Sequence, residues 1–140
     1  MKKPFSIPVR VYYQDTDAGG VVFHAQYLAF MERARTELLN EAGLDLARIA
    51  DEQRVLFLVY DLKVRYHQPA RLNDRLAVTA EVAKMGRASL LFRQRVERGA
   101  ELLVEGDITV ALVNRDRMRP ARMPEELATA LDAVHTKALK

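Results

Sequence analysis

The chain has 140 residues, of which 49% are hydrophobic and 29% charged, and 22 basic against 19 acidic residues give it a net charge of +3 at pH 7. This length predicts one folded domain over residues 1–140, and the absence of cysteine excludes disulfides, a thiolate nucleophile and a cysteine zinc site. No stretch approaches the roughly 20 apolar residues of a membrane-spanning helix and no apolar run follows the first lysines, so we expect a cytoplasmic protein with no secretory signal and no integral membrane segment.

Residues 5–14 predict the first strand, because apolar and polar side chains alternate along them. In this pattern Val9, Val11 and Tyr13 share one face of the strand. An acidic loop with two glycines follows and leads into a long helix, which Gly43 ends as a left-handed cap. The apolar stripe of that helix consists of Tyr27, Phe30, Met31, Ala34 and Leu38.

Four more strands are predicted after the helix. The apolar run Val55–Tyr60 is typical of a strand buried on both faces, and the strand continues through Tyr66. The last three strands, residues 75–84, 89–98 and 102–114, follow one another with short glycine-containing connections. Such connections are typical of an antiparallel meander.

Short helical segments are expected at residues 44–53 and from Pro124 onward, where proline and two glutamates suit the first turn of a helix. Together the elements predict an α+β fold, in which one five-stranded antiparallel sheet wraps around the long central helix. Such a sheet leaves its edge strands unpaired. Unpaired edges favour a homo-oligomer formed by edge pairing or by a shared helix layer.

The acidic loop before the long helix carries the candidate chemistry. The carboxylate of Asp17 precedes Gly19 and Gly20, and the first turn of a helix presents unpaired amides that attract a polarised carbonyl oxygen. A carboxylate beside such donors is typical of an acyl-transfer or hydrolysis site. The same spacing also fits a structural role, in which Asp17 makes an Asx-type bond in a turn and Asp15 ties the amides of the loop.

A metal site is not expected in this loop. As a calcium loop that starts at Asp15, the sequence would have Gly19 at position five and Gln26 at position twelve, where a side-chain ligand and a bidentate glutamate are needed. A transition-metal site of Asp15, Asp17 and His24 lacks a convincing further ligand. His24 itself suits either a cap of the helix or a general acid, base or orienting donor.

Residues 13–28, which read YQDTDAGGVVFHAQYL, closely resemble the signature of the 4-hydroxybenzoyl-CoA-thioesterase-like hotdog superfamily. Within it, the resemblance is to the tol–pal-associated (YbgC-type) acyl-CoA thioesterases. The likeness covers nearly the whole chain. It extends through residues 32–37, Val64-Arg65-Tyr66, Pro69-Ala70-Arg71 and Met118-Arg119-Pro120.

The resemblance implies a hotdog fold, assembled as homodimers and often homotetramers with active sites between protomers. It implies that Asp17 is the catalytic carboxylate, acting as nucleophile or general base on the thioester, and that no cofactor is needed. The amide of His24 would polarise the thioester carbonyl, and its side chain would orient substrate or water. Tyr13, Gly20 and Tyr27 would shape the loop and the substrate pocket. The family usually has Asn where this chain has Gln26, so no polar role is carried over to that side chain.

Basic residues are expected to hold the phosphates of coenzyme A. Lys84, Arg87 and Ser89 lie at a turn that resembles the nucleotide-contacting turn of the family, and Arg119 and Arg122 lie in a second basic segment. Each of these side chains also suits ordinary solvated surface. Nucleic acid is not an expected partner, since the chain has no tryptophan and no platform of interleaved aromatic and basic residues.

These observations predict an acyl-CoA thioesterase that releases free acid and CoA. One alternative is a weakly catalytic module that binds acyl carrier protein or lipid-synthesis enzymes through its basic surface. Another is a hotdog dehydratase, which would use a histidine with an acid from the other subunit. The position of Asp17 before the helix disfavours the dehydratase.

Overall fold

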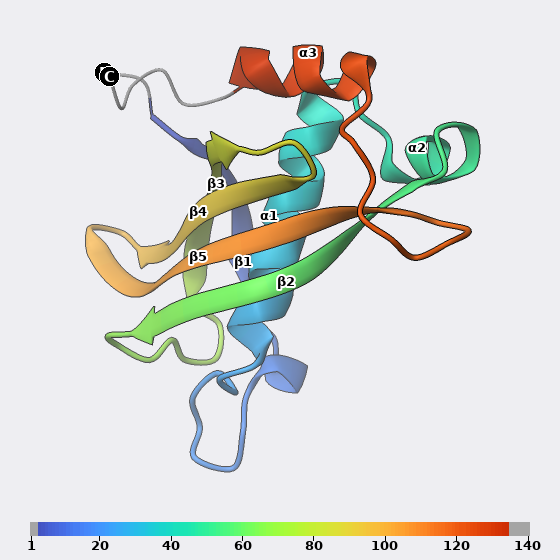
Figure 1. Ribbon diagram of the computed structural model, residues 1–140. Helices are drawn as coiled ribbons and strands as arrows, with labels where there is room; N and C mark the ends of the chain where they lie inside the picture. Colours follow the sequence, from blue (N-terminus) through green and yellow to red (C-terminus); the bar gives the residue numbers. More distant parts are fainter. Residues whose placement is uncertain (1–2, 135–140) are drawn as a thin grey trace.

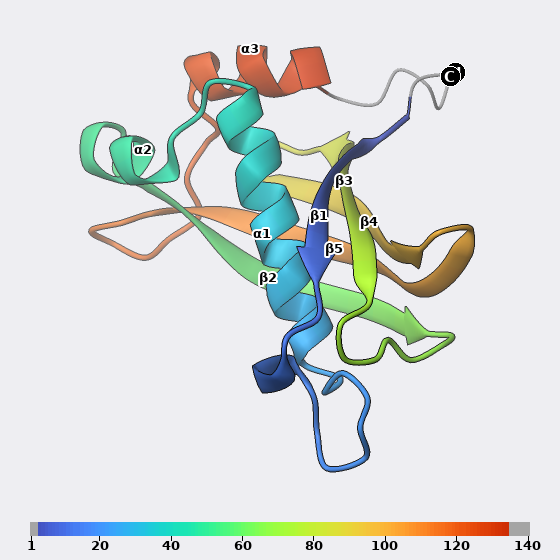
Figure 2. The same ribbon diagram turned by 180° about the vertical axis from the view of Figure 1, so that it is seen from behind.

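Five strands form one antiparallel sheet in the order β1-β3-β4-β5-β2 in a computed structural model that describes residues 3–134. The elements are β1 (Phe5–Arg10), η1, a 3₁₀ turn (Tyr13–Asp15), α1 (Gln26–Glu41), α2 (Leu46–Glu52), β2 (Val55–Tyr66), β3 (Arg75–Met85), β4 (Ser89–Arg98), β5 (Glu101–Asn114) and α3 (Glu125–Val134). The sheet curves around α1, which lies against one face in both views (Figures 1 and 2). The predicted α+β hotdog architecture is confirmed.

The core lies between α1 and the inner face of the sheet. Phe30, Met31 and Ala34 of α1 are fully buried, and the helix packs mainly against β3, β1 and β4. Gly43 has a φ of 83° and follows the helix as the predicted left-handed cap. The amide of Leu44 then donates to the carbonyl of Leu39 at 2.8 Å, which closes the last turn.

A buried amide, that of Gln94, hydrogen-bonds across this core. Gln94 of β4 has no exposed surface, and its amide nitrogen donates to the carbonyls of Met31 at 2.9 Å and Thr79 at 3.0 Å. These two bonds leave its oxygen to accept from the guanidinium of Arg35 at 2.9 Å. Arg35 is 9% exposed and lies over the ring of Phe92. Gln94 therefore ties the middle of the sheet to α1 and holds a buried charge.

The first strand is shorter than predicted. β1 ends at Arg10, and residues 13–15 form η1, so the predicted strand through residue 14 is wrong. The carboxylate of Asp15 accepts from the amide of Tyr12 at 2.8 Å, and the amide of Asp15 donates to the carbonyl of Tyr12 at 2.9 Å. These two bonds close a turn. Tyr13 points outward as a result and is 82% exposed, not on the face of Val11.

The prediction that Val55–Tyr60 is buried on both faces is wrong for the single chain. β2 is an edge strand that pairs only with β5 in the described sheet. Val59 and Tyr60 are 51% and 76% exposed, and the register with β5 shifts between Val59 and Asp61. An apolar stretch at an open sheet edge is a surface for pairing with another chain. None of the helices in residues 3–134 has the length and apolar character to span a membrane.

Candidate functional site

Residues 16–22, named here the Asp17 hairpin, form a tight loop between η1 and α1. Thr16 and Val22 form a bridge, and the amide of Asp17 donates to the carbonyl of Val21 at 2.8 Å. Gly20 closes the turn with a φ of 81°, a conformation that favours glycine. One oxygen of Asp17 accepts from the amide of Gly19 at 2.8 Å, so the Asx-type role is present. The carboxylate is exposed and forms no ion pair with any residue in 3–134.

The loop between β2 and β3, residues 67–74, supports the Asp17 hairpin and is named here the supporting loop. The amide of Val22 donates to the carbonyl of Ala70 at 2.9 Å, and the amide of Ala70 donates to the hydroxyl of Tyr27 at 2.9 Å. Burial raises the pKa of the Tyr27 hydroxyl. The predicted pocket residue Tyr27 is thus buried beneath the hairpin, whereas Tyr13 is exposed beside it. The supporting loop, through Ala70, and helix α1, through Tyr27, therefore fix the position of the hairpin.

Asp74 closes the supporting loop. One of its carboxylate oxygens accepts from the amide of Arg71 at 2.8 Å and from the guanidinium of Arg98 at 2.7 Å. Burial by itself raises the pKa of Asp74, but these two donors and their charges outweigh it and hold the pKa below its ordinary value. The loop is therefore held by a charge-assisted contact to the end of β4.

His24 precedes the helix rather than opening it. α1 begins at Gln26 with Ala25 as its N-cap, because Val22 continues in extended pairing with Thr16 and Ala70. Within residues 3–134, the amides of His24 and Ala25 donate to no protein acceptor. The imidazole of His24 is exposed and its ring centre lies 4.4 Å from that of Phe23. Unpaired amides at the positive end of a 16-residue helix suit a carbonyl oxygen that gains negative charge.

A pocket of about 290 Å³ opens next to His24. Its lining residues are Val22, His24, Tyr27, Tyr66, His67, Gln68 and Pro69. The hydroxyl of Tyr66 donates to the carbonyl of His24 at 2.8 Å. His67 makes a 2.7 Å contact with Glu105, and this hydrogen bond is the main reason that the pKa of Glu105 lies below its ordinary value. Sequence reasoning assigned no site role to Tyr66 or His67, since only the end of β2 brings them to the helix start.

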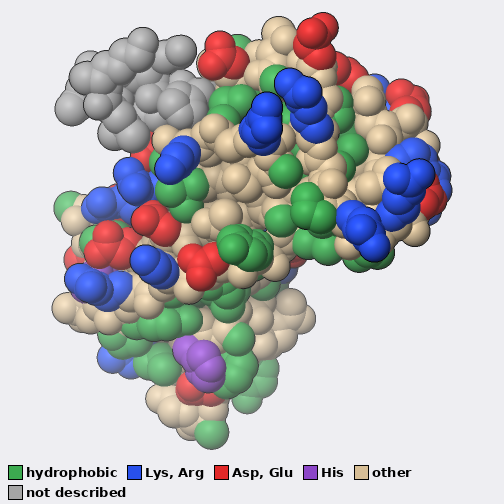
Figure 3. All heavy atoms as spheres, viewed as in Figure 1, with side chains coloured by type: hydrophobic (Ala, Val, Ile, Leu, Met, Phe, Trp, Pro, Cys, Tyr) green, Lys and Arg blue, Asp and Glu red, His purple; other side chains and the backbone are tan. Residues whose placement is uncertain are grey.

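The predicted nucleotide-binding residues gather at the other end of the sheet. We name Lys84, Arg87, Ser89, Arg119 and Arg122 the basic end. The amide of Met123 donates to the carbonyl of Arg87 at 2.9 Å, and the amide of Ala121 donates to the carbonyl of Leu112 at 2.9 Å. The first bond holds the second basic segment against the β3–β4 turn, and the second holds it against β5. The four basic side chains are exposed, and Figure 3 shows Lys and Arg gathered over the loop that follows β5.

The basic end and the Asp17 hairpin are far apart within one chain. Leu112, which accepts from Ala121 in the second basic segment, pairs with Phe57 near the start of β2. Tyr66 at the end of β2 meets His24. At roughly 3.3 Å per residue, the stretch of β2 between Phe57 and Tyr66 measures about 30 Å. In Figure 1 the hairpin lies below the sheet, whereas the β3–β4 turn lies above it near α3.

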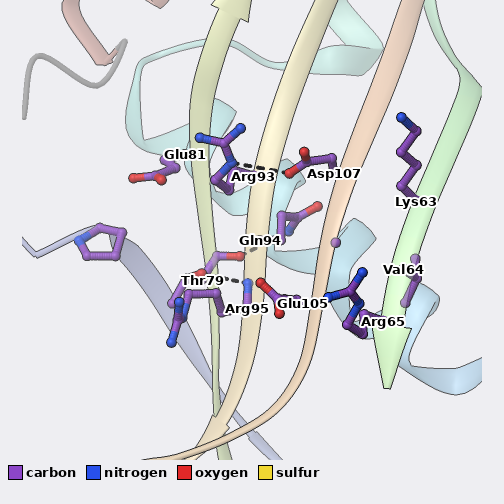
Figure 4. Close-up of a pocket in the computed structure, with 12 residues that line it drawn as sticks. Lys63, Val64, Arg65, Thr79, Glu81, Arg93, Gln94, Arg95, Glu105 and Asp107 are labelled. Carbon is purple, nitrogen blue, oxygen red and sulfur yellow. Dashed lines mark hydrogen bonds and ion pairs between the residues drawn. The ribbon is translucent and has the colours of Figure 1, made fainter. Parts of the chain in front are cut away.

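A second hollow, of about 420 Å³, lies on the outer face of the sheet (Figure 4). Oppositely charged side chains face one another across its strands. The first row is Glu81, Arg93, Asp107 and Lys63, and the second is Thr79, Arg95, Glu105 and Arg65. Arg93 and Asp107 form an ion pair of 3.2 Å. The first row has two acids and two bases, and the second has one acid between two bases, so most of these charges are compensated by a neighbour within the row and we assign this hollow no chemistry. No group of three or more His, Asp or Glu that could hold a metal occurs in residues 3–134.

Comparisons with known proteins agree with this architecture. A model of the family described as "Thioesterase superfamily" matches residues 19–105. The chain is 44% identical over 126 residues to the acyl-CoA thioesterase YbgC of Haemophilus influenzae, covering 90% of this chain and 93% of that one. It is 44% identical over 124 residues to the acyl-CoA thioester hydrolase YbgC of Escherichia coli, covering 88% and 92%. The crystal structure of a hypothetical protein from Thermus thermophilus superposes with a TM-score of 0.86 at 35% identity, covering 93% and 98%. The chain therefore belongs to the thioesterase superfamily.

Proposed function

We propose that this protein is an acyl-CoA thioesterase, which hydrolyses acyl-CoA to a free acid and CoA. The observation that carries the proposal is an exposed Asp17 carboxylate on a hairpin whose next residues present the unpaired amides of His24 and Ala25. The Haemophilus acyl-CoA thioesterase and the Escherichia acyl-CoA thioester hydrolase, each 44% identical to this chain, support the same reaction. The absence of cysteine suits the reducing cytoplasm, where we expect the enzyme to act.

The site supplies both halves of a thioester hydrolysis. The amide of His24 donates to the thioester oxygen and stabilises the negative charge that develops there. The carboxylate of Asp17 takes a proton from water, which adds to the carbonyl carbon, or Asp17 attacks that carbon itself. The C–S bond then breaks and the CoA thiolate leaves. In the first case it takes up the proton held by Asp17; in the second, water hydrolyses the mixed anhydride formed on Asp17, which releases the acid, restores the carboxylate and supplies the proton. The imidazole of His24 orients substrate or water, and Tyr13, Gly20 and Tyr27 shape the pocket.

We propose that two protomers build each site. The exposed apolar residues Val59 and Tyr60 lie on an open strand edge, and pairing of two such edges would bury them. Antiparallel pairing of two β2 strands places the start of one strand beside the end of the other. The partner's basic end would then lie toward this protomer's Asp17 hairpin. The two parts of each site would thus come from different protomers, although they lie about 30 Å apart within one chain.

In this arrangement the basic end binds the nucleotide of CoA. Arg87, Arg119 and Arg122 supply guanidinium forks for phosphate oxygens, and Lys84 adds a point charge. Ser89 is half-buried at the turn, where its carbonyl accepts from the amide of Gly86 at 2.8 Å. The hydrogen bonds that join the turn to the second basic segment hold these side chains on one surface.

Asp17→Asn tests the assignment. The variant keeps an oxygen that can accept from the amide of Gly19, so the hairpin keeps its shape while the negative charge is lost. Turnover of an acyl-CoA panel is expected to fall by at least about 10²-fold, with the unfolding temperature unchanged. Asp132→Asn, at an exposed position of α3, is the matched control and should keep full activity. Full activity of Asp17→Asn would reject the assignment, and a chelator should leave wild-type activity intact.

A second candidate is a weakly catalytic module that binds acyl carrier protein or lipid-synthesis enzymes. The exposed basic end favours it, because acyl carrier protein is acidic. Titration of purified acyl carrier protein at rising salt separates the two functions. Robust acyl-CoA hydrolysis with no carrier-protein binding at low salt would remove the second candidate.

A further inference from the structure

Tyr66 connects the end of β2 to the loop that precedes α1. Its hydroxyl donates to the carbonyl of His24 at 2.8 Å, although the two residues are 42 positions apart in the chain. We propose that Tyr66 is a positioning residue of the thioesterase, which holds and polarises the peptide bond between His24 and Ala25. This inference rests on the proposed function, in which the amide of His24 binds the thioester oxygen, and it adds the unpaired amide of Ala25 as a second donor to that oxygen.

The sheet gives Tyr66 a rigid base. It is the last residue of β2 and pairs with Val104 of β5, and the amide of the next residue, His67, donates to the carbonyl of Leu103 at 2.7 Å. The ring of Tyr66 meets the edge of the Tyr27 ring at a centroid distance of 5.7 Å. A side chain fixed by a strand and a neighbouring ring sets the direction of a bond more closely than one on a free loop.

The hydroxyl of Tyr66 remains a donor under working conditions. Burial raises its pKa above the ordinary value for tyrosine, so it stays protonated at neutral pH. A carbonyl that accepts a hydrogen bond makes the N–H of the same peptide a stronger donor. Here that N–H belongs to Ala25, whose amide donates to no acceptor within residues 3–134. Fixing the carbonyl of His24 also restricts the orientation of the backbone N–H of His24 itself.

The size of the effect follows from the hydrogen bonds involved. One donor to a developing oxyanion is worth about 10²–10³ in kcat, and one cooperative bond strengthens the next by about 10–30%. Loss of the Tyr66 hydroxyl would remove about 10–30% of the free energy that this donor contributes to the transition state. This fraction of a 10²–10³-fold effect lowers kcat by about two- to eightfold. KM should change less than kcat, because the thioester oxygen carries its full charge only in the transition state.

Tyr66→Phe is the test, with two readouts. Steady-state hydrolysis of an acyl-CoA gives kcat and KM separately, and the amide proton resonance of Ala25 in ¹⁵N-alanine-labelled protein reports the polarisation of the peptide. The expected result is a lower kcat, a nearly constant KM and an upfield shift of the Ala25 amide proton. Tyr12→Phe, an equal deletion at an exposed tyrosine near the hairpin, should match wild type in both readouts.

Three results would overturn the inference. One is an unchanged kcat in Tyr66→Phe. Another is a raised KM with unchanged kcat, which would make Tyr66 part of the pocket wall. The third is an Ala25 resonance that does not move, because the peptide would then not be polarised by the hydroxyl. If wild-type protein hydrolysed no member of the acyl-CoA panel, the proposed function would fail, and the Ala25 resonance would still decide whether Tyr66 polarises this peptide.

Discussion

Gln94→Leu removes an amide that joins the sheet to α1 through the core. Gln94 is fully buried, and its oxygen is the acceptor for the guanidinium of Arg35, which is 9% exposed. Burial lowers the pKa of Arg35, but an arginine stays charged in a protein. Gln94 is neutral, so its loss removes hydrogen bonds: the bond to a charged guanidinium is worth about 1.5–3 kcal/mol, and a buried carbonyl left without its donor costs about 1–3 kcal/mol. The variant is therefore expected to lose about 3–5 kcal/mol of unfolding free energy.

Arg35→Met and the double variant sharpen the prediction. Arg35→Met leaves the oxygen of Gln94 without a donor, which costs about 1–3 kcal/mol. Replacing both partners by apolar side chains of similar size removes the stranded charge and the stranded oxygen together. The double variant should thus be more stable than Gln94→Leu alone, a coupling of about 2 kcal/mol or more within the range for residues in contact.

Urea unfolding followed by circular dichroism measures these free energies. All variants are compared at one protein concentration, since association would shift apparent stability. Gln14→Leu, at an exposed position, is the control and should stay within about 0.5 kcal/mol of wild type. Additive losses in the double variant, or a Gln94→Leu protein within about 1 kcal/mol of wild type, would refute the reasoning, because the buried charge would then not depend on Gln94.

Two further predictions concern the supporting loop and the sheet edge. Because the folded-state pKa of Asp74 lies below its ordinary 3.8, its contribution to stability is present above that pH and is lost as the pH falls through the lowered value. Asp74→Asn should thus unfold more easily than wild type at pH 7 and lose less stability on acidification; parallel pH profiles of the unfolding temperature would contradict this. Val59→Lys places a charge on the open edge of β2 and should lower the mass measured by light scattering toward that of one chain; an unchanged mass would exclude edge pairing through this stretch.

The order of elements and most of their boundaries could be predicted from local patterns. Gly43 ends α1 and the last three strands form a meander because helix caps and short turns depend on neighbouring residues. Burial of β2 could not be predicted, since the run Val55–Tyr60 reads the same whether its second face meets another element or another chain. The extended pattern through Tyr13 also misled, because the side chain of Asp15 competes for the backbone of Tyr12.

The candidate site divides in the same way. The motif around Asp17 and His24 is contiguous, so its residues could be named from sequence. Tyr66 and Gln94 act through partners 42 and 63 positions away, and no local pattern signals such contacts. The roughly 30 Å between the Asp17 hairpin and the basic end depends on where β2 starts and stops. The number of residues between the two segments in the sequence does not predict that distance.

The alternating rows on the outer face have a consequence for how a charged molecule approaches. Glu81 and Asp107 offset Arg93 and Lys63 in the first row, so this broad surface has little field of its own. In the proposed function the exposed cations of the basic end would therefore attract the phosphates of CoA before the acyl group reaches the pocket. Salt screens such an attraction over about 10 Å at 0.1 M, so we expect ionic strength to change the rate of encounter and to leave the breaking of the thioester bond largely unchanged.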